Sequence, residues 1–265
     1  MTRRKVLITG ASGLIGGLTI KHLGDKYDFS GLSRRPVVGI PHLAADITDA
    51  EAIEPAFAGI HTVLHLAAAT GADEWLAWGP TMAITVQGTL NVYEAAREAG
   101  VKRVVFFSSG CCQLAWEWEH DLPYGKLANG PDSEIPESWP MVELDWSVRP
   151  DSPYAVAKLF GENLGRYYAD KYAISTIVIR LGAVLKEDRP LVRRHYPGYL
   201  SQADCVQLID KCLSAPDTLK YDIFNAISEN KYRWRSTDHT KAVLGWQPTG
   251  RAEDFPLAAT DLAGN

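Results

Sequence analysis

Tyr154 and Lys158 are the residues of this 265-residue chain whose types and spacing best suit proton transfer. Four residues apart, they fall on one face of a helix. A free tyrosine titrates at about 10 and is a poor base at neutral pH, but a nearby ammonium group and the positive ring of an oxidised nicotinamide both favour the phenolate. We therefore expect Tyr154 to take the proton of an alcohol, or to return it in the reverse direction.

Ser109 completes the expected catalytic group. It ends the apolar run RVVFFSS, where a strand is predicted, and its hydroxyl is expected to orient the substrate oxygen against Tyr154. Lys158 is also expected to hydrogen-bond the nicotinamide ribose. For Tyr154 and Lys158 taken alone, an exposed helix face is the alternative, and the glycine-rich start of the chain favours catalysis over it.

Three spaced glycines stand where the apolar run KVLIT meets a segment of helical period. Glycine at such a turn lets the backbone approach a pyrophosphate, and the helix start offers unpaired N–H groups and the positive end of the helix dipole. A glycine-rich turn without a ligand is the alternative. The sequence predicts a dinucleotide-binding turn made of Gly10, Ser12, Gly13, Leu14, Ile15 and Gly16.

The end of the second predicted strand bears on the choice of cofactor. A carboxylate there binds the ribose of NAD, whereas an arginine accommodates the 2′-phosphate of NADP. The residues here are Ser33, Arg34 and Arg35, and two guanidinium groups suit a phosphate dianion. We predict NADP rather than NAD as the cofactor. The alternative is that both arginines are solvated loop charges.

Residues after the third and fourth predicted strands are expected to complete the cofactor site. Asp46, followed by Ile47, is placed to reach the adenine, although it would serve nearly as well as the N-cap of the next helix. After the fourth strand, Leu66, Ala67 and Ala68 are expected to let the cofactor pass close to the backbone.

The segments that would position these residues alternate between strands and helices. Apolar runs such as VVFF and ISTIVI are continuous, which is typical of strands buried on both faces of a parallel sheet. The predicted fold is α/β, a doubly wound parallel sheet of the Rossmann type. Residues 1–182 are assigned to this domain, with an inserted loop at 110–152, and residues 183–265 to a small substrate-binding subdomain.

The inserted loop is rich in tryptophan, proline and glycine and is longer than ordinary α/β connections. Trp116 and Trp118 lie within it, while Trp75 and Trp78 follow the fourth strand. Both loops are expected to emerge at the carboxyl edge of the sheet, where ligands bind. The tryptophans would line a substrate slot there or, alternatively, pack the long loop onto the domain.

The composition excludes several classes of partner. With 27 basic and 32 acidic residues the formal charge is −5, so no nucleic acid is expected as a partner. No apolar segment reaches the roughly 20 residues that a membrane span needs. The cysteines show neither a disulfide framework nor metal-ligand spacing, and Cys111 and Cys112 are expected to be pocket walls rather than nucleophiles. A cytoplasmic protein without a metal site is predicted.

The chain resembles the short-chain dehydrogenase/reductase superfamily, and its extended branch in particular. The matching stretches span almost the whole length and include ITGASGLIG, AADITD, VLHLAAA, SPYAVAKLFGE, IVIRLG, YDIFNA and LGWQP. Within that branch the pattern is most similar to uronate dehydrogenases and related sugar 1-dehydrogenases. The resemblance implies hydride transfer between a nicotinamide and an alcohol or carbonyl of a small molecule, with a sugar or uronate C1 as the narrower candidate, by a homodimer.

The resemblance also implies roles for individual residues. Catalytic roles would fall to Ser109, Tyr154 and Lys158, and substrate contacts to Thr70, Ser109, Gly110, Cys111 and Arg194, the last of which would hold a uronate carboxylate. The chain departs from the pattern where Gly110 and Cys111 replace an Asn-His pair and where Ala183 replaces a serine.

Two other functions remain open on the same fold. A nucleotide-sugar epimerase or dehydratase generally needs a larger substrate domain, and the dehydratases resemble a Thr-Asp-Glu pattern that Ser109, Gly110 and Cys111 do not match. A non-catalytic NADP-sensing regulator usually lacks the tyrosine or the lysine, and this chain keeps both.

Overall fold

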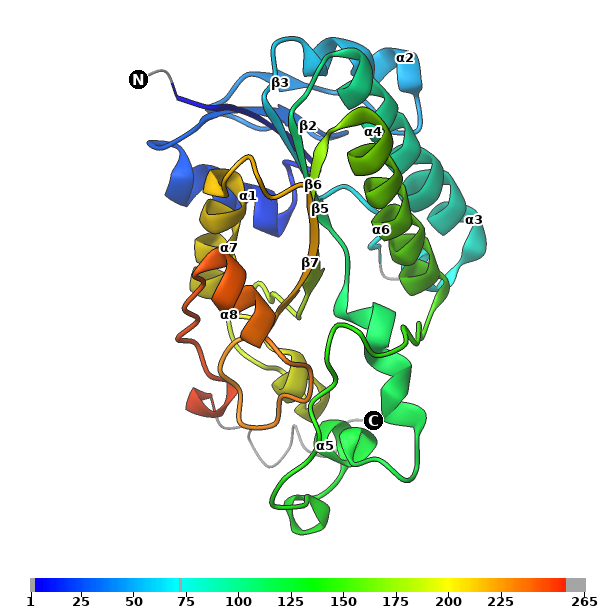
Figure 1. The fold of residues 1–265 in the computed structure, drawn as a ribbon, viewed down its shortest axis with the longest axis vertical. Coiled ribbons are helices and arrows are strands. Elements are labelled where there is room, and N and C mark those ends of the chain that lie inside the picture. The colour runs from blue at the N-terminus through cyan, green and yellow to red at the C-terminus, as the bar shows by residue number, and fades with distance from the viewer. Residues whose placement is uncertain (1–2, 72, 256–265) are drawn as a thin grey trace. The chain divides into compact units, whose positions relative to one another are not determined.

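The computed structural model of the protein describes residues 3–71 and 73–255. Its sheet has seven strands in the order β3-β2-β1-β4-β5-β6-β7 (Figure 1). The contacts from β3 through to β6 are parallel, which confirms the predicted doubly wound α/β fold. The strands are β1 (Lys5–Thr9), β2 (Asp28–Leu32), β3 (His42–Leu43), β4 (Thr62–His65), β5 (Arg103–Phe107), β6 (Ser175–Leu181) and β7 (Tyr221–Ala226).

Helices connect the strands. The α-helices are α1 (Leu14–Leu23), α2 (Ala50–Ile53), α3 (Trp78–Pro80), α4 (Gly88–Glu98), α5 (Tyr124–Asn129), α6 (Pro153–Tyr172), α7 (Gln202–Ser214) and α8 (Asp238–Leu244). A π-helical stretch, η3 (Thr81–Gln87), joins α3 to α4. The 3₁₀ segments are η1 (Glu54–Phe57), η2 (Glu74–Leu76), η4 (Gly110–Trp118), η5 (Asp132–Glu134), η6 (Arg193–Gly198) and η7 (Ala252–Asp254).

The chain forms two compact units whose segments interleave along the sequence. Unit 1 comprises Met1–Ser108, Ser152–Ile179 and Cys212–Ile223. Unit 2 comprises Ser109–Asp151, Arg180–Lys211 and Phe224–Asn265.

Unit 1 holds the central strands. In Figure 1, α4 and α6 cover one face of the sheet and α1 lies on the other. Strands β4 and β5 are buried along their whole length, which explains their continuous apolar sequences. β1 lies between β2 and β4, so the chain order reverses at its carboxyl end, and this is where ligands bind in open parallel sheets.

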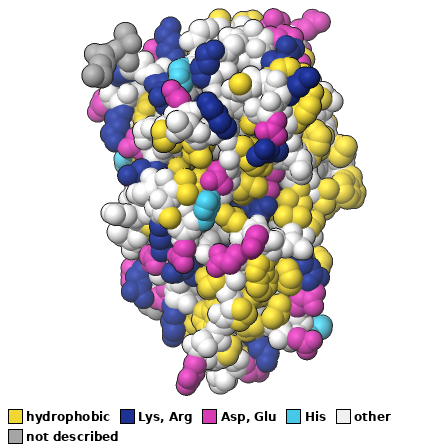
Figure 2. Space-filling view, in the orientation of Figure 1, with side chains coloured by type: hydrophobic (Ala, Val, Ile, Leu, Met, Phe, Trp, Pro, Cys, Tyr) yellow, Lys and Arg dark blue, Asp and Glu magenta, His cyan; other side chains and the backbone are white. Residues whose placement is uncertain are grey.

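Helix α6 follows the caps expected from the sequence. The Ser152 side chain accepts a hydrogen bond from the backbone N–H of Ala155, and Pro153 occupies the first turn. The helix ends at Tyr172, and its C-cap, Ala173, is in the left-handed conformation. Hydrophobic side chains gather on the right side of the molecule in Figure 2, where α3 and α6 lie in Figure 1. Trp78 of α3, Met82 of η3 and Phe160 of α6 are exposed.

Unit 2 has a hydrophobic core of its own. Tyr124, Tyr199 and Trp234 are almost fully buried in it, and the Tyr124 and Trp234 rings stack 5.0 Å apart. Trp116 and Trp146 pack at its edge with their ring centroids 5.1 Å apart. The aromatic residues that follow β5 therefore form a folded layer rather than an open loop.

Asp204 holds two parts of unit 2 together. Its buried carboxylate accepts hydrogen bonds from the Ser228 hydroxyl at 2.6 Å and from the backbone N–H groups of Thr249 and Gly250 at 2.8 and 2.9 Å. The Trp246 ring donates to the Asp204 carbonyl oxygen at 3.1 Å. These bonds give a structural reason for the LSQADC and LGWQPTG stretches.

The third strand, β3, is only two residues long, lies at the edge of the sheet and pairs with β2 alone. One expectation from the sequence needs correction. The segment predicted as a loop at 110–152 contains η4, α5 and η5. In the part of the chain that the structure describes, no helix combines the length and the apolar character needed to cross a membrane.

Candidate active site

A cavity of about 500 Å³ opens in unit 1 at the carboxyl ends of β1, β2 and β4, and we call it the first pocket. Twelve residues predicted from the sequence line it: Gly10, Ser12, Gly13, Ser33, Arg34, Arg35, Asp46, Ile47, Leu66, Ala67, Ala68 and Thr70. Thr70, which was expected on the substrate side, lies here among the residues predicted to bind the cofactor. Leu14, Ile15 and Gly16 belong to the start of α1 and are not among the described lining residues.

The glycine turn between β1 and α1 leaves room for a ligand. Gly10 has a φ of +70°, and a Cβ there would lie 2.9 Å from the backbone nitrogen of Ala67. Gly13 is the N-cap of α1 and provides no side-chain cap for the first N–H groups of the helix. A turn with glycine at its first and last positions, at the start of a ten-residue helix, fits a dinucleotide phosphate.

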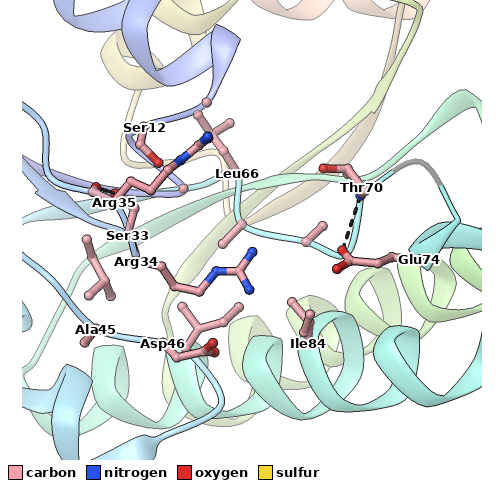
Figure 3. A pocket seen from close by; sticks show the side chains of 17 residues that line it. Ser12, Ser33, Arg34, Arg35, Ala45, Asp46, Leu66, Thr70, Glu74 and Ile84 are labelled. Carbon is pink, nitrogen blue, oxygen red and sulfur yellow. Dashed lines mark hydrogen bonds between the residues drawn. The ribbon is translucent and has the colours of Figure 1, made fainter.

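Two arginines stand at the end of β2. Arg34 and Arg35 are exposed, and both line the first pocket. The Ser33 hydroxyl donates to the Arg35 carbonyl oxygen at 2.8 Å and lies 2.9 Å from Nε2 of His42. These contacts fix the turn at Ser33–Arg35. Figure 3 shows Arg34 extending into the pocket from one side, with Thr70 and Glu74 on the other.

Asp46 does not cap α2. Its carboxylate accepts hydrogen bonds from the backbone N–H and the hydroxyl of Thr48 at 3.0 and 2.9 Å, whereas Asp49 is the N-cap. The alternative that Asp46 is a helix cap is therefore wrong. Asn91 of α4 donates to the Ile47 carbonyl oxygen at 2.9 Å and holds this segment beside the pocket.

A buried network orients the segment that follows β4. His65 Nδ1 lies 2.6 Å from the Thr9 hydroxyl, and His65 Nε2 lies 3.1 Å from the Thr89 hydroxyl. Because Thr89 donates its proton to the Thr85 carbonyl oxygen, the network assigns the ring proton to Nε2. Burial lowers the pKa of His65 to about 3, and the charge of Lys158 adds to this shift. A neutral His65 thus supports the Leu66–Ala68 wall of the pocket.

The tyrosine and lysine of α6 come together as predicted. Lys158 is 2% exposed, and its Nζ lies 5.4 Å from the centroid of the Tyr154 ring. The ammonium donates to the Phe107 carbonyl oxygen at 2.7 Å, at the last residue of β5. A buried cation is therefore held beside a half-buried phenol.

A second cavity, of about 350 Å³, lies within unit 2, and we call it the second pocket. Ser109, Gly110, Cys111 and Arg194, which were predicted on the substrate side, line it together. Ser109 is the N-cap of η4, and its side-chain oxygen accepts a hydrogen bond from the Cys111 N–H at 3.1 Å. The remaining lining residues are Leu114, Glu117, Leu181, Gly182, Ala183, His195, Pro197, Gly198, Trp234 and Arg235.

An ion pair crosses the second pocket. Arg194 Nη2 lies 3.4 Å from the Glu117 carboxylate, whose side chain is 5% exposed. Burial raises the pKa of Glu117 to about 7, and the attraction of Arg194 and Arg235 only partly offsets it. Burial also raises the pKa of the Cys111 thiol, with Asp151 adding to the rise, which suits a pocket wall rather than a nucleophile.

Several lining residues were missed from the sequence. Gly71, Glu74 and Ile84 line the first pocket, and Glu74 accepts a hydrogen bond from the Gly71 N–H at 3.3 Å. Glu117 and Arg235 line the second pocket, and no local motif marks either of them. Among the residues with described positions, no cluster of three or more His, Cys, Asp or Glu side chains is placed to hold a metal ion.

A family model described as the NAD dependent epimerase/dehydratase family matches residues 6–213, and the chain belongs to this extended short-chain dehydrogenase/reductase family. It is 32% identical to the NAD-dependent glucose-6-phosphate dehydrogenase of Haloferax volcanii over 97% of both chains. It is 31% identical to an L-arabinose 1-dehydrogenase (NAD(P)(+)) of the same organism, over 92% of this chain and 96% of that protein.

Uronate dehydrogenases are similar in sequence and in structure. The enzyme of Pseudomonas putida is 28% identical over 96% of this chain and 87% of its own. The crystal structure of uronate dehydrogenase from Agrobacterium tumefaciens matches with a TM-score of 0.78 and 28% identity, over 96% of this chain and 88% of that chain. A tyrosine-to-alanine mutant of the enzyme from that organism was solved in complex with NAD. These matches confirm the fold and the family expected from the sequence.

Proposed function

We propose that this protein is an NADP(H)-linked oxidoreductase that oxidises a sugar at C1, or reduces the corresponding carbonyl, through Ser109, Tyr154 and Lys158. The observation that carries the proposal is the buried Lys158 ammonium, 5.4 Å from the Tyr154 ring centroid. A cation in that position favours the phenolate form of Tyr154, as a general base requires. Relatives whose names state dehydrogenation of glucose 6-phosphate, L-arabinose and uronate support a sugar as the substrate.

Each residue has a distinct task in the proposed reaction. The bound nicotinamide supplies the hydride acceptor or donor. Tyr154 takes the hydroxyl proton of the substrate during oxidation and returns it during reduction. Lys158, held by the Phe107 carbonyl oxygen, stabilises the negative charge on the Tyr154 oxygen. Ser109 keeps a hydroxyl proton to donate to the substrate oxygen while its own oxygen accepts from Cys111.

A screen tests the oxidoreductase proposal. Purified protein is given NADP or NAD together with glucose, L-arabinose, glucuronate or glucose 6-phosphate, and reduced nicotinamide is followed by its absorbance. We expect sustained reduction of NADP with at least one sugar. Tight binding of NADP without turnover of any sugar, alcohol or carbonyl would instead identify a non-catalytic NADP-binding protein.

The preference for NADP rests on Arg34 and Arg35, which line the first pocket at the strand end where an NAD-binding site of this fold carries a carboxylate. The two Haloferax volcanii relatives are named for NAD and for NAD(P)(+), so the proposed preference for NADP differs from the cofactor in the name of the first. Replacing both arginines by alanine should raise the KM for NADP about 10- to 100-fold, because a hydrogen bond to a charged group contributes about 1.5–3 kcal/mol. The KM for NAD should change less than about twofold.

The control for this variant is Arg166→Ala. Arg166 is 57% exposed in its side chain and pairs with Asp170 on α6, away from the first-pocket lining. Its replacement should leave both KM values as they are. If replacing both Arg34 and Arg35 by alanine raised the KM for NADP and the KM for NAD equally, the assignment of NADP would be wrong.

We also propose a homodimer in the cytoplasm. The exposed Val156, Phe160 and Tyr167 of α6 supply apolar surface for a second copy. Cys111, Cys112, Cys205 and Cys212, all within the described residues, form no disulfide bond, which suits a reducing compartment. Light scattering should give twice the monomer mass, and the monomer mass alone would exclude the dimer.

A further inference from the structure

Arg235 occupies the space that a side chain at position 110 would otherwise fill. A Cβ at Gly110 would overlap the Nη1 atom of Arg235 and would lie 2.7 Å from its Cζ. A Cβ at Gly198 would lie 3.3 Å from Nη2 of the same arginine. The guanidinium therefore lies between two glycines, and all three residues line the second pocket. The guanidinium fits in this place because position 110 has no side chain.

This arginine lacks the partners that a structural buried arginine has. Arg103, 1% exposed, donates to Ser175, Ala215 and other acceptors in unit 1. Arg235 is 4% exposed, yet within the described residues its Nε has no hydrogen-bond partner. Its Cζ stacks 5.0 Å from the Trp234 ring centroid, which fixes the plane of the guanidinium but satisfies no N–H group. Because Nε has almost no accessible surface, a ligand acceptor would meet the guanidinium at the Nη groups, which lie beside Gly110 and Gly198 of the pocket lining.

The charges in the second pocket favour an anionic ligand. Glu117, the acidic residue of the lining, is paired with Arg194. Burial and the charge of Arg194 lower the pKa of His195, which favours its neutral form, so the positive charge of the lining comes from the two guanidinium groups. Two guanidinium groups thus face one carboxyl group, and the pocket has excess positive charge next to Ser109.

We propose that Arg235 is a substrate-binding residue and that the sugar oxidised by this protein carries an anionic group, a phosphate or a carboxylate, which the Arg235 guanidinium binds in the second pocket. The inference rests on the proposed function for the reaction, which is oxidation of a sugar. The negative charge of the ligand is inferred from the second pocket alone, from Gly110 and Gly198 beside the guanidinium and from the pairing of Glu117 with Arg194. Guanidinium binds both anions through paired N–H donors, so the chemistry is shared by the two substrate classes.

The test compares anionic with neutral sugars. The wild-type protein and Arg235→Gln are assayed with glucose 6-phosphate, glucuronate, glucose and L-arabinose, and binding of each sugar is measured separately by calorimetry. We expect the wild type to favour one of the two anionic sugars, and the sugar it prefers identifies phosphate or carboxylate as the group bound. In Arg235→Gln the ratio of kcat/KM for that anionic sugar to that for L-arabinose should fall about 10- to 100-fold, and the Kd should rise to match.

The matched control is Arg233→Gln. Arg233 lies two residues earlier, pairs with Glu229 at 2.8 Å and does not line the second pocket. Its replacement should leave the anionic-to-neutral ratio as it is. If Arg235→Gln lowers turnover of anionic and neutral sugars to the same extent, Arg235 only supports the fold, and the inference fails.

Two further variants cover the case in which Arg235→Gln does not fold. Gly110→Ala places a methyl group where the guanidinium lies and should lower the same ratio. Arg235→Lys keeps the charge but loses the paired donors, so its ratio should fall less than that of Gly110→Ala. An unchanged ratio in Gly110→Ala would also overturn the inference.

The two proposals fail separately. If calorimetry shows Arg235-dependent binding of an anionic sugar but no cofactor is reduced, the binding role of Arg235 holds and the oxidoreductase proposal is wrong. If the protein oxidises neutral sugars as well as anionic ones and Arg235→Gln changes neither, the proposed function holds and the inference is wrong.

Discussion

Glu117 is a buried carboxyl group whose charge changes within the neutral range. Its folded-state pKa, about 7, lies above the ordinary carboxyl value because burial disfavours the ionised form, and Asp151 adds to this effect against Arg194 and Arg235. A carboxyl group with a raised folded-state pKa stabilises the fold fully only below its unfolded-state pKa. Stability from this group is therefore lost as the pH rises from about 4.5 to about 7.

Glu117→Gln should remove this loss. Relative to the wild type, the variant should gain stability between pH 5 and pH 8, by up to about 3 kcal/mol in the free energy of unfolding, since one pKa unit corresponds to about 1.4 kcal/mol. Urea unfolding at several pH values measures the difference. Glu98→Gln, with a side chain 55% exposed, serves as the control and should track the wild type. If the free energy of unfolding of Glu117→Gln depends on pH as steeply as that of the wild type, the Glu117 carboxyl group is not the source of the pH dependence.

The residues of the two pockets differ in how far the sequence predicts them. Tyr154 and Lys158 are predictable because four residues of helix bring them together, and helical spacing is local information. Glu117, Arg194 and Arg235 meet in one cavity although more than a hundred residues separate the first from the last. Only tertiary packing brings these three together, so no spacing rule identifies the second pocket.

At the scale of elements, the turn between β1 and α1 sets the geometry of the first pocket. Gly10 there has a positive φ and approaches the backbone of Ala67 after β4. Gly10→Ala should destabilise the protein by about 1–3 kcal/mol, because the added methyl group would meet backbone atoms and the φ is strained for alanine. It should also weaken NADPH binding at least tenfold, as measured by fluorescence titration and thermal melting.

Gly17→Ala is the matched control on the same element. A Cβ at Gly17 would meet nothing within 4 Å, and the residue is exposed within α1. Alanine is favoured over glycine in a helix by about 0.5–1 kcal/mol, so this variant should be as stable as the wild type or more so. Equal effects of the two substitutions would contradict the role assigned to the turn.

The elements were predicted best where the sequence pattern is local. The strand–turn–helix at Gly10 and the capped helix at Ser152 follow from short stretches of sequence. The segment after Ser109 was expected to be a loop because its many Trp, Pro and Gly residues obscure helical periodicity. It contains short helices because aromatic residues from distant segments, such as Tyr199 and Trp234, complete a core around them.

At the scale of the whole molecule, the first pocket belongs to unit 1 and the second pocket to unit 2. Unit 1 presents the glycine turn, Arg34 and Arg35, and unit 2 presents Ser109, Arg194 and Arg235. A ligand that binds only the folded state stabilises it by mass action. We therefore expect the cofactor and the substrate each to raise the stability of the protein.

The melting temperature should report the choice of cofactor. At a concentration 100 times its Kd, a ligand adds about 2.7 kcal/mol to the free energy of unfolding. NADP should raise the melting temperature more than NAD at the same concentration, and the difference should disappear when Arg34 and Arg35 are both alanine. A larger shift with NAD in the wild type would contradict the assignment of NADP.

The similarity of the whole chain to sugar dehydrogenases supports the proposed oxidation of a sugar. The family match spans residues 6–213, and three groups of relatives act on different sugars by name. Their common element is oxidation of a sugar, and their differences lie in the group that the substrate carries. The contacts around Arg235 concern the group that the substrate carries. The inference about Arg235 therefore adds to what the relatives have in common.

The most direct test of the central claim is the rate of cofactor reduction by Tyr154→Phe with the best sugar substrate of the wild type. Removal of the phenol oxygen should lower kcat at least about 100-fold, since general base catalysis contributes a factor of about 10²–10⁴. NADPH binding should persist, and the control Tyr167→Phe, on an exposed part of α6, should retain the wild-type rate. A kcat for Tyr154→Phe within about threefold of the wild type would contradict the assignment of Tyr154 as the proton-transfer residue.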